Sequence, residues 1–218
     1  MAQLDGPRWG PASRGTPRQL VVLCHGVGAD GHDLIDLAPG WAKALPDAAF
    51  AAPDAPFPYD MAPSGRQWFS LADRAPAVLE AGIRRAAPLL DAFIDAELTR
   101  LGLPGDAYAM MGFSQGAMMS LFTGLRRKVA PRAILAFSGA LIAPASLANE
   151  IANRAPVLLV HGEDDDVVPA ALSRAAESAL AGAGVPVTAV FRPRLGHGID
   201  DVGLSTGALF LQKAFATG

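Results

Sequence analysis

The residue of this chain whose setting best suits covalent chemistry is Ser114, the centre of a G-x-S-x-G motif at residues 112–116. The apolar run 107–111 predicts a buried strand before the motif, and the apolar run 117–122 predicts a helix after it. Glycine has no Cβ, so the flanking glycines permit a sharp strand-to-helix turn that presents a serine hydroxyl at a helix N-terminus. Free N–H groups at that position favour developing negative charge. The motif therefore predicts a nucleophilic serine.

A serine hydroxyl needs a general base, and the base needs an orienting acid. In the α/β-hydrolase arrangement the acid and then the histidine follow the serine along the chain. Of the four histidines, His25 and His32 precede Ser114, and His161 ends a buried apolar run where we expect a structural role. His197 lies in a glycine-containing loop between the last predicted strand and the last predicted helix. We predict that His197 is the base.

The acid is expected in the loop 162–169, directly after the strand that ends at His161. Four carboxylates compete there, and their spacing alone does not choose among them: Glu163, Asp164, Asp165 and Asp166. A cation site is disfavoured because no other oxygen-ligand pattern accompanies this run. We therefore expect no metal and no cofactor.

Two backbone N–H groups are needed to hold an oxyanion, one after the nucleophile and one from the loop after an earlier strand. Gln115 supplies the first, and Val27 is the natural second donor. The same early loop offers an alternative, because residues 26–31 match G-x-G-x-x-G between a strand and a helix. Asp47 and Asp54 lie near the spacing of a ribose-binding acid, so a dinucleotide-binding oxidoreductase is the rival hypothesis. That hypothesis does not explain Ser114, the acidic loop 162–169 or His197.

Apolar runs alternate with helical patterns along the chain, which predicts an α/β fold with a parallel sheet covered on both faces. The predicted strands are Leu20–Cys24, Ala48–Ala52, Ala107–Met111, Ala133–Phe137, Val157–Val160 and Val187–Phe191. The predicted helices are Leu34–Leu45, Pro76–Leu101, Gln115–Leu125, Ala145–Ala152, Ala170–Ala181 and Leu204–Phe215. Pro88 should kink or break the longest helix. The aromatic-rich stretch 53–74 is expected to form a packed loop over the site.

Composition sets the broad class. The chain has 218 residues, a formal net charge of −3 and no cluster of basic residues, which suits one domain (19–218) behind a polar N-terminal segment (1–18) and gives no footprint for nucleic acid. No apolar segment suits a secretion signal or a membrane span. Cys24 is the single cysteine, expected to be a small buried side chain, so no intrachain disulfide is available. A cytoplasmic bacterial protein without stable membrane association is expected, and a homodimer is left open.

Taken together, these motifs resemble the phospholipase/carboxylesterase family of α/β-hydrolases, which includes bacterial carboxylesterases and acyl-protein thioesterases. The resemblance runs from about Leu20 to Phe215 and rests on residues 25–31, 52–56, 68–69, 112–116, 161–169 and 196–197. The family pattern H-G-x-x-D-x-x-V-P implies that Asp165 is the acid of a catalytic triad with Ser114 and His197. It also implies that Val27 and Gln115 hold the oxyanion.

The resemblance implies a serine esterase whose substrate is a small acyl ester, cleaved through an acyl-enzyme. The expected fold is a mostly parallel sheet with helices on both faces and no large lid domain, because the chain is small for this architecture and has no obvious insertion. That favours soluble or monomeric esters over lipid droplets, and short- to medium-chain acyl esters are the expected substrates. Lysophospholipids or acylated proteins with longer chains are the alternative substrates. Side chains that could wall an acyl pocket are Trp68, Phe69, Met61, Leu71, Phe113, Val168 and Leu195.

Overall fold

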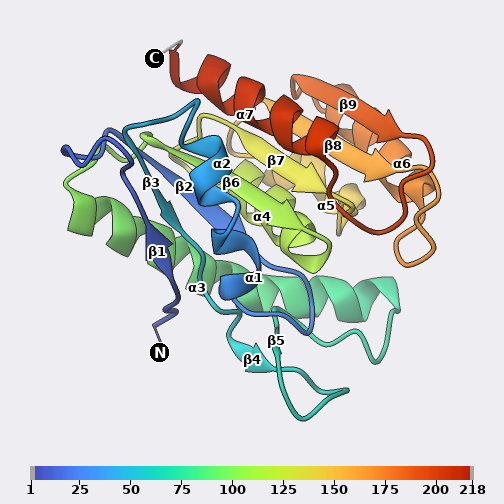
Figure 1. Cartoon of the computed structure of the whole chain (residues 1–218). Coiled ribbons are helices and arrows are strands. Elements are labelled where there is room, and N and C mark those ends of the chain that lie inside the picture. The colour runs from blue at the N-terminus through green and yellow to red at the C-terminus, as the bar shows by residue number, and fades with distance from the viewer. Residues whose placement is uncertain (1–2, 217–218) are drawn as a thin grey trace.

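The central element of the computed structural model, which describes residues 3–216, is a seven-stranded sheet that is parallel except at one edge. Its strands are β1 (Arg8–Trp9), β2 (Gln19–Cys24), β3 (Ala48–Ala51), β6 (Tyr108–Phe113), β7 (Ile134–Phe137), β8 (Val157–Gly162) and β9 (Val187–Arg192). Their spatial order is β1-β3-β2-β6-β7-β8-β9 (Figure 1). All six predicted strands are present, and the predicted α/β-hydrolase fold is confirmed.

The polar N-terminal segment contributes an edge strand that the sequence pattern did not predict. β1 pairs antiparallel with β3, with Arg8 opposite Ala51. The side chain of Leu4 is buried in the core, and Arg8 forms an ion pair with buried Glu97 at 2.7 Å. This part of the segment therefore packs on the rest of the molecule.

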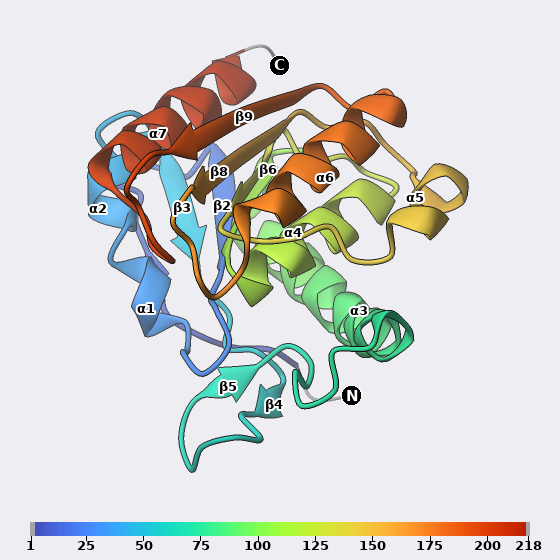
Figure 2. The ribbon, with the colours of Figure 1, turned by 90° about the vertical axis from the view of Figure 1, so that its right-hand side faces the viewer.

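Helices cover both faces of the sheet, as Figure 2 shows. On one face lie α3 (Pro76–Leu101), α4 (Gln115–Arg126), α5 (Pro144–Glu150) and α6 (Ala170–Gly182), whose apolar side chains pack in two clusters. On the other face, α1 (His32–Ile35), α2 (Ala38–Trp41) and α7 (Asp201–Ala216) pack in a third cluster. The strands β2, β3, β6, β7 and β8 are thus buried on both sides, which explains their apolar sequences, whereas the edge strand β9 is only partly buried.

Two helix predictions need correction. The single helix expected at 34–45 is the pair α1 and α2, because Pro39 has no N–H to continue a helix and suits the first turn of a new one. The expected break at Pro88 does not occur, since α3 runs continuously from Pro76 to Leu101. Pro88 is exposed, so water can satisfy the carbonyl that loses its partner.

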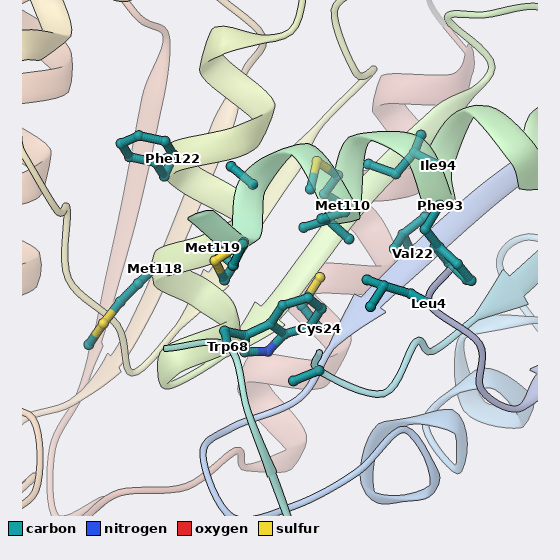
Figure 3. Packing of buried hydrophobic residues seen from close by; sticks show 14 of the residues in the cluster. Leu4, Val22, Cys24, Trp68, Phe93, Ile94, Met110, Met118, Met119 and Phe122 are labelled. Carbon is teal, nitrogen blue, oxygen red and sulfur yellow. The ribbon is translucent and has the colours of Figure 1, made fainter. Parts of the chain in front are cut away.

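The stretch 53–74 forms a small hairpin and a buried return. The hairpin strands are β4 (Phe57–Pro58) and β5 (Arg66–Gln67), and they project beyond the carboxyl ends of the parallel strands (Figures 1 and 2). The return carries Trp68 into the core beside Cys24 and Met119, as Figure 3 shows. Cys24 is a buried free thiol as predicted, and burial raises its pKa to about 12.

The strand order locates the site. The connection from β2 to β3 passes over one face through α1 and α2, whereas the connection from β6 to β7 passes over the other face through α4. The loops that follow the neighbouring strands β2 and β6 therefore diverge at a topological switch point, where open parallel sheets bind ligands. Those loops contain Val27 and Ser114. Within residues 3–216, no helix is long and apolar enough to cross a membrane.

Candidate active site

Ser114 occupies a strained turn between β6 and α4. Its φ of 54° and ψ of −117° lie in a region that non-glycine residues seldom adopt. The turn leaves no room for side chains on either flank, because a Cβ at Gly112 would lie 2.1 Å from the Gly116 carbonyl oxygen and one at Gly116 would lie 1.9 Å from that of Cys24. The glycines thus permit close backbone packing, while the strain itself rests on the serine.

Asp165 and His197 are brought together by the loops after β8 and β9. His197 Nδ1 donates to Asp165 Oδ2 at 2.7 Å. The His197 ring packs on Phe113, the residue before the serine, with ring centroids 4.9 Å apart. The imidazole therefore lies beside the strained turn, with Nδ1 directed to the carboxylate.

The carboxylate of Asp165 is buried and well supplied with donors. Its Oδ1 accepts hydrogen bonds from the N–H groups of Val167 and Val168, at 2.9 and 2.8 Å. Burial alone would raise the pKa of Asp165, but the hydrogen bonds from His197, Val168 and Val167 outweigh it and hold the pKa below its ordinary value. Asp165 is therefore an anion at neutral pH.

The other acidic side chains of this loop are exposed. Glu163, Asp164 and Asp166 all point to solvent, and Glu163 pairs with Arg174 on α6 at 2.9 Å. Of the four carboxylates that the sequence left in competition, Asp165 is thus the buried one and the one that His197 contacts.

The loop after β2 lies against Ser114 on the side away from His197. A Cβ at Gly26 would lie 3.4 Å from Ser114 Cβ, so the backbone that carries Val27 reaches the serine closely. Gln115 begins α4, and the first N–H groups of a helix have no partner inside the helix. The two proposed oxyanion donors therefore come from adjacent strand ends.

Neutral side chains also connect this region through buried hydrogen bonds that no sequence motif predicts. The buried amide of Gln115 accepts from Trp68 N–H at 2.8 Å and donates to the Phe69 carbonyl at 2.7 Å. Trp68 Nε1 donates to the carbonyl of His25 at 2.9 Å. The aromatic return at residues 68–69 thus joins the loop after β2 to the start of α4.

The side chain of His25 belongs to the same hydrogen-bond network. Its Nε2 accepts the N–H of Ala55 at 2.9 Å, so Nδ1 carries the proton and donates to the Gly26 carbonyl at 2.7 Å. Burial lowers the pKa of His25, which keeps the ring neutral. The sequence feature that could have indicated a supporting role is position along the strand. His25 and His161 both lie at the carboxyl ends of parallel strands, where side chains reach the site.

The glycines of the G-x-G-x-x-G pattern bind other parts of the protein. Gly28 N–H donates to the Arg66 carbonyl at 2.7 Å, and Arg66 N–H donates to Ala29 at 2.9 Å, which straps the hairpin to this loop. Gly31 N–H donates to Asp54 Oδ1 at 2.8 Å. These two N–H groups and the carboxylate of Asp54, the candidate ribose-binding acid, are therefore already hydrogen-bonded within the protein. This arrangement argues against a dinucleotide site in the loop.

The predicted pocket residues fall in three environments. Trp68, Phe69 and Val168 are buried in the core, Leu71, Phe113 and Leu195 are partly buried, and Met61 is 67% exposed at the hairpin tip. Phe69 also borders a groove of about 360 Å³ between the hairpin and α3. Whether these side chains contact an acyl group stays a prediction. Within residues 3–216, no group of three or more His, Cys, Asp or Glu side chains converges on a metal-sized site.

Comparisons with known proteins cover most of the chain. Residues 11–215 match the family model described as phospholipase/carboxylesterase. Esterase YpfH of Escherichia coli (strain K12) is 31% identical over 184 residues, covering 84% of this chain and 78% of that protein. Acyl-protein thioesterase 1 of Schizosaccharomyces pombe is 32% identical over 167 residues, covering 73% and 74%. The crystal structure of esterase PE8 matches with a TM-score of 0.92 at 42% identity, covering 98% of this chain and 100% of that one.

Proposed function

This chain belongs to the phospholipase/carboxylesterase family and is a carboxylic ester hydrolase, and from that membership we propose a serine carboxylesterase that cleaves short- to medium-chain acyl esters. The proposal assigns Ser114 as nucleophile, His197 as general base and Asp165 as the acid that orients the imidazole. It assigns the Val27 and Gln115 N–H groups as oxyanion donors.

The proposed reaction has two halves. Ser114 Oγ attacks the ester carbonyl as His197 Nε2 takes its proton, and the two N–H groups hold the oxyanion, each contributing about 3 kcal/mol to lowering the barrier. His197 then gives the proton to the leaving alcohol. Water, activated by the same imidazole, hydrolyses the acyl-enzyme and restores the serine.

The observation that carries this proposal is the hydrogen bond between His197 Nδ1 and the buried Asp165 carboxylate, with the imidazole packed on Phe113 next to Ser114. The carboxylate is anionic and fixed, so it favours the imidazolium that forms during attack. The strained serine at a helix N-terminus supplies the matching nucleophile.

A second candidate, hydrolysis of longer acyl chains on lysophospholipids or thioesters, is favoured by relatives named acyl-protein thioesterase 1. The exposed apolar side chains of Met61 and Val167 on the loops beside the site would suit a longer chain. This candidate uses the same triad and differs only in the acyl group that it accepts.

The deciding experiment is the initial rate on p-nitrophenyl esters from acetate to palmitate, with Ser114→Ala measured beside the wild type. Ser138→Ala is the matched control, since Ser138 is a buried serine at the end of the neighbouring strand β7. We expect rates that peak at short or medium chains, that vanish in Ser114→Ala and that persist in Ser138→Ala. A peak at long chains favours the second candidate, and equal rates for wild type and Ser114→Ala would overturn the nucleophile.

A further inference from the structure

Asp165 has a second imidazole on the same oxygen that faces His197. His161 Nε2 lies 3.1 Å from Asp165 Oδ2, on β8 at the strand end that leads into the loop. The side chains of His161 and Asp165 are both 0% exposed. The triad as proposed makes no use of His161, so a buried ionisable ring in contact with the acid needs an explanation.

The neighbours of His161 determine where its proton lies. Nε2 also lies 2.8 Å from the carbonyl oxygen of Val168, and since both neighbours of Nε2 are acceptors, Nε2 must carry a hydrogen. Nδ1 lies 2.6 Å from Ser173 Oγ on α6, which lies 3.1 Å from the carbonyl oxygen of Gly139.

The serine hydroxyl has one proton to give. If Ser173 donates to Gly139, then Nδ1 must donate to Ser173 and His161 is a cation; if Ser173 donates to Nδ1, the ring is neutral. Both arrangements leave an Nε2–H that binds the Val168 carbonyl, with the Asp165 carboxylate 3.1 Å from the same nitrogen. The result does not depend on the charge of the ring.

Few other charges reach this cluster. Asp165 and, through it, His197 are the ionisable groups in contact with His161. The neighbouring carboxylates of the loop are exposed, and Arg174, next to Ser173 on α6, turns away to Glu163 and the ring of Phe191. Asp165 therefore accepts hydrogen bonds on both oxygens, from backbone N–H groups on Oδ1 and from His197 on Oδ2, and the His161 ring contacts Oδ2.

We infer that His161, held by Ser173, is a positioning residue whose Nε2–H holds the backbone of Val168 and thereby the Asp165 carboxylate, so that Oδ2 meets His197. It acts through Asp165 and has no contact with the substrate. The same N–H binds the carbonyl of Val168, whose own N–H binds Oδ1. His161 therefore restrains Oδ1 through the Val168 backbone, and its ring packs against Oδ2. This inference rests on the proposed function, since it assigns Asp165 to the triad.

The first test compares His161→Met with His161→Gln by separate measurement of kcat and KM on the best p-nitrophenyl ester. Methionine fills a similar volume without a donor, whereas glutamine can present an N–H near the position of Nε2. We expect kcat of His161→Met to fall on the order of 10- to 100-fold with KM almost unchanged, since misplacement affects the chemical step. Glutamine should restore most of that loss. Equal kcat losses in the two variants, or none in a folded His161→Met, would overturn the inference.

The second test approaches the ring from its other nitrogen and stands even if His161→Met fails to fold. Ser173→Ala removes the partner of Nδ1, and Ser178→Ala is the matched control on the same helix, because its hydroxyl bonds the helix's own Arg174 carbonyl. We expect a several-fold loss of kcat at constant KM for Ser173→Ala and wild-type values for Ser178→Ala. Wild-type kcat in Ser173→Ala would overturn the role given to Ser173.

The two proposals fail in different ways. Activity that survives Ser114→Ala removes the proposed nucleophile and with it the triad. Activity that vanishes in Ser114→Ala but is unchanged in folded His161→Met leaves the function intact and removes only the positioning role.

Discussion

The two sides of the candidate site are built from different materials. The acid side (His161, Asp165, Ser173 and His197) consists of ionisable and hydroxyl side chains that contact one another directly. The oxyanion side (His25, Trp68 and Gln115, with the backbone of Val27) consists of neutral side chains that hold main-chain segments in place. On the proposed assignments, the acid side contributes side chains to the reaction. The side chains of the oxyanion side instead hold the backbone donors in place.

The difference separates activity from stability. On the proposed assignments, a substitution on the acid side removes a group that takes part in proton transfer or one that positions such a group, so it should cost rate. A substitution on the oxyanion side leaves the N–H donors in the chain but leaves buried polar partners unsatisfied, so it should cost folding free energy.

The largest expected effect is on the acid side. Asp165→Asn should lower kcat by about 10⁴-fold, because an amide cannot stabilise the imidazolium and favours the wrong tautomer of His197. Steady-state kinetics on a p-nitrophenyl ester measures this loss. Asp164→Asn and Asp166→Asn are matched controls at exposed neighbours and should retain wild-type rates. A larger loss at either neighbour than at Asp165 would reassign the acid.

On the oxyanion side, Gln115→Ala should lower the free energy of unfolding by about 2–4 kcal/mol, because the buried N–H of Trp68 and carbonyl of Phe69 lose their partners. Urea denaturation measures the change. Gln67→Ala is the control, as a buried glutamine whose Oε1 accepts a long 3.5 Å bond from Asp60 N–H. Equal destabilisation by the two truncations would mean that the Gln115 amide contributes nothing beyond its volume.

As the pH falls, His25 on the oxyanion side should lose its contribution to folding stability at a higher pH than Asp165 on the acid side does. The pKa of His25 is lowered on folding by burial, so its neutral form contributes stability above the ordinary histidine value of 6.5, and that contribution is lost as pH falls toward the folded pKa. The pKa of Asp165 is lowered from 3.8, so its contribution is lost only below that value.

Unfolding free energies measured from pH 7.5 to 5 would test this order. We expect wild type to lose stability over that range, and His25→Gln, which can still accept the Ala55 N–H through Oε1, to lose less. Identical pH slopes in the two proteins would show that His25 does not titrate on unfolding.

The smallest effect is expected at the hairpin tip. Met61→Ser should change the free energy of unfolding by no more than about 0.5 kcal/mol, because Met61 is 67% exposed. Its rate profile over ester chain lengths should stay close to that of the wild type. A selective loss on the longer esters would show instead that the tip contacts the acyl chain and belongs to the site.

The sequence predicted the fold where local pattern and tertiary environment agree. Five of the six predicted strands are buried on both faces and read as apolar runs, and the edge strand β9 is apolar over most of its length, so all six were found to within about two residues. The bounds of α3 were predicted fully, since Pro76 opens it and Gly102, in the left-handed conformation, ends it. The two-residue strands β1, β4 and β5 have no pattern of their own and exist only through their partners.

The same division applies to the site. Ser114 and His197 were identified because chain order and loop position restrict the choice, whereas Asp165 needed the family pattern to separate it from three neighbours. The partners of the supporting side chains lie far along the chain, such as Gln115 with Trp68 and Phe69. Such pairings arise from the packing of loops, and no local spacing encodes them.

The hydrogen bonds between Arg66 and the loop after β2 hold the base of the hairpin, and the tip of the hairpin lies beyond them. Gly65 has no space for a Cβ, which would lie 2.1 Å from the Gly28 carbonyl oxygen, and Tyr59 N–H donates to Gly65 at 3.0 Å. Beyond that point residues 60–64 are all exposed. Longer segments in a flexible exposed turn cost little loop-closure entropy. Residues 60–64 are therefore a point at which longer sequence could be inserted to alter substrate range, while the loop that carries Val27, a proposed oxyanion donor, keeps its hydrogen bonds to Arg66.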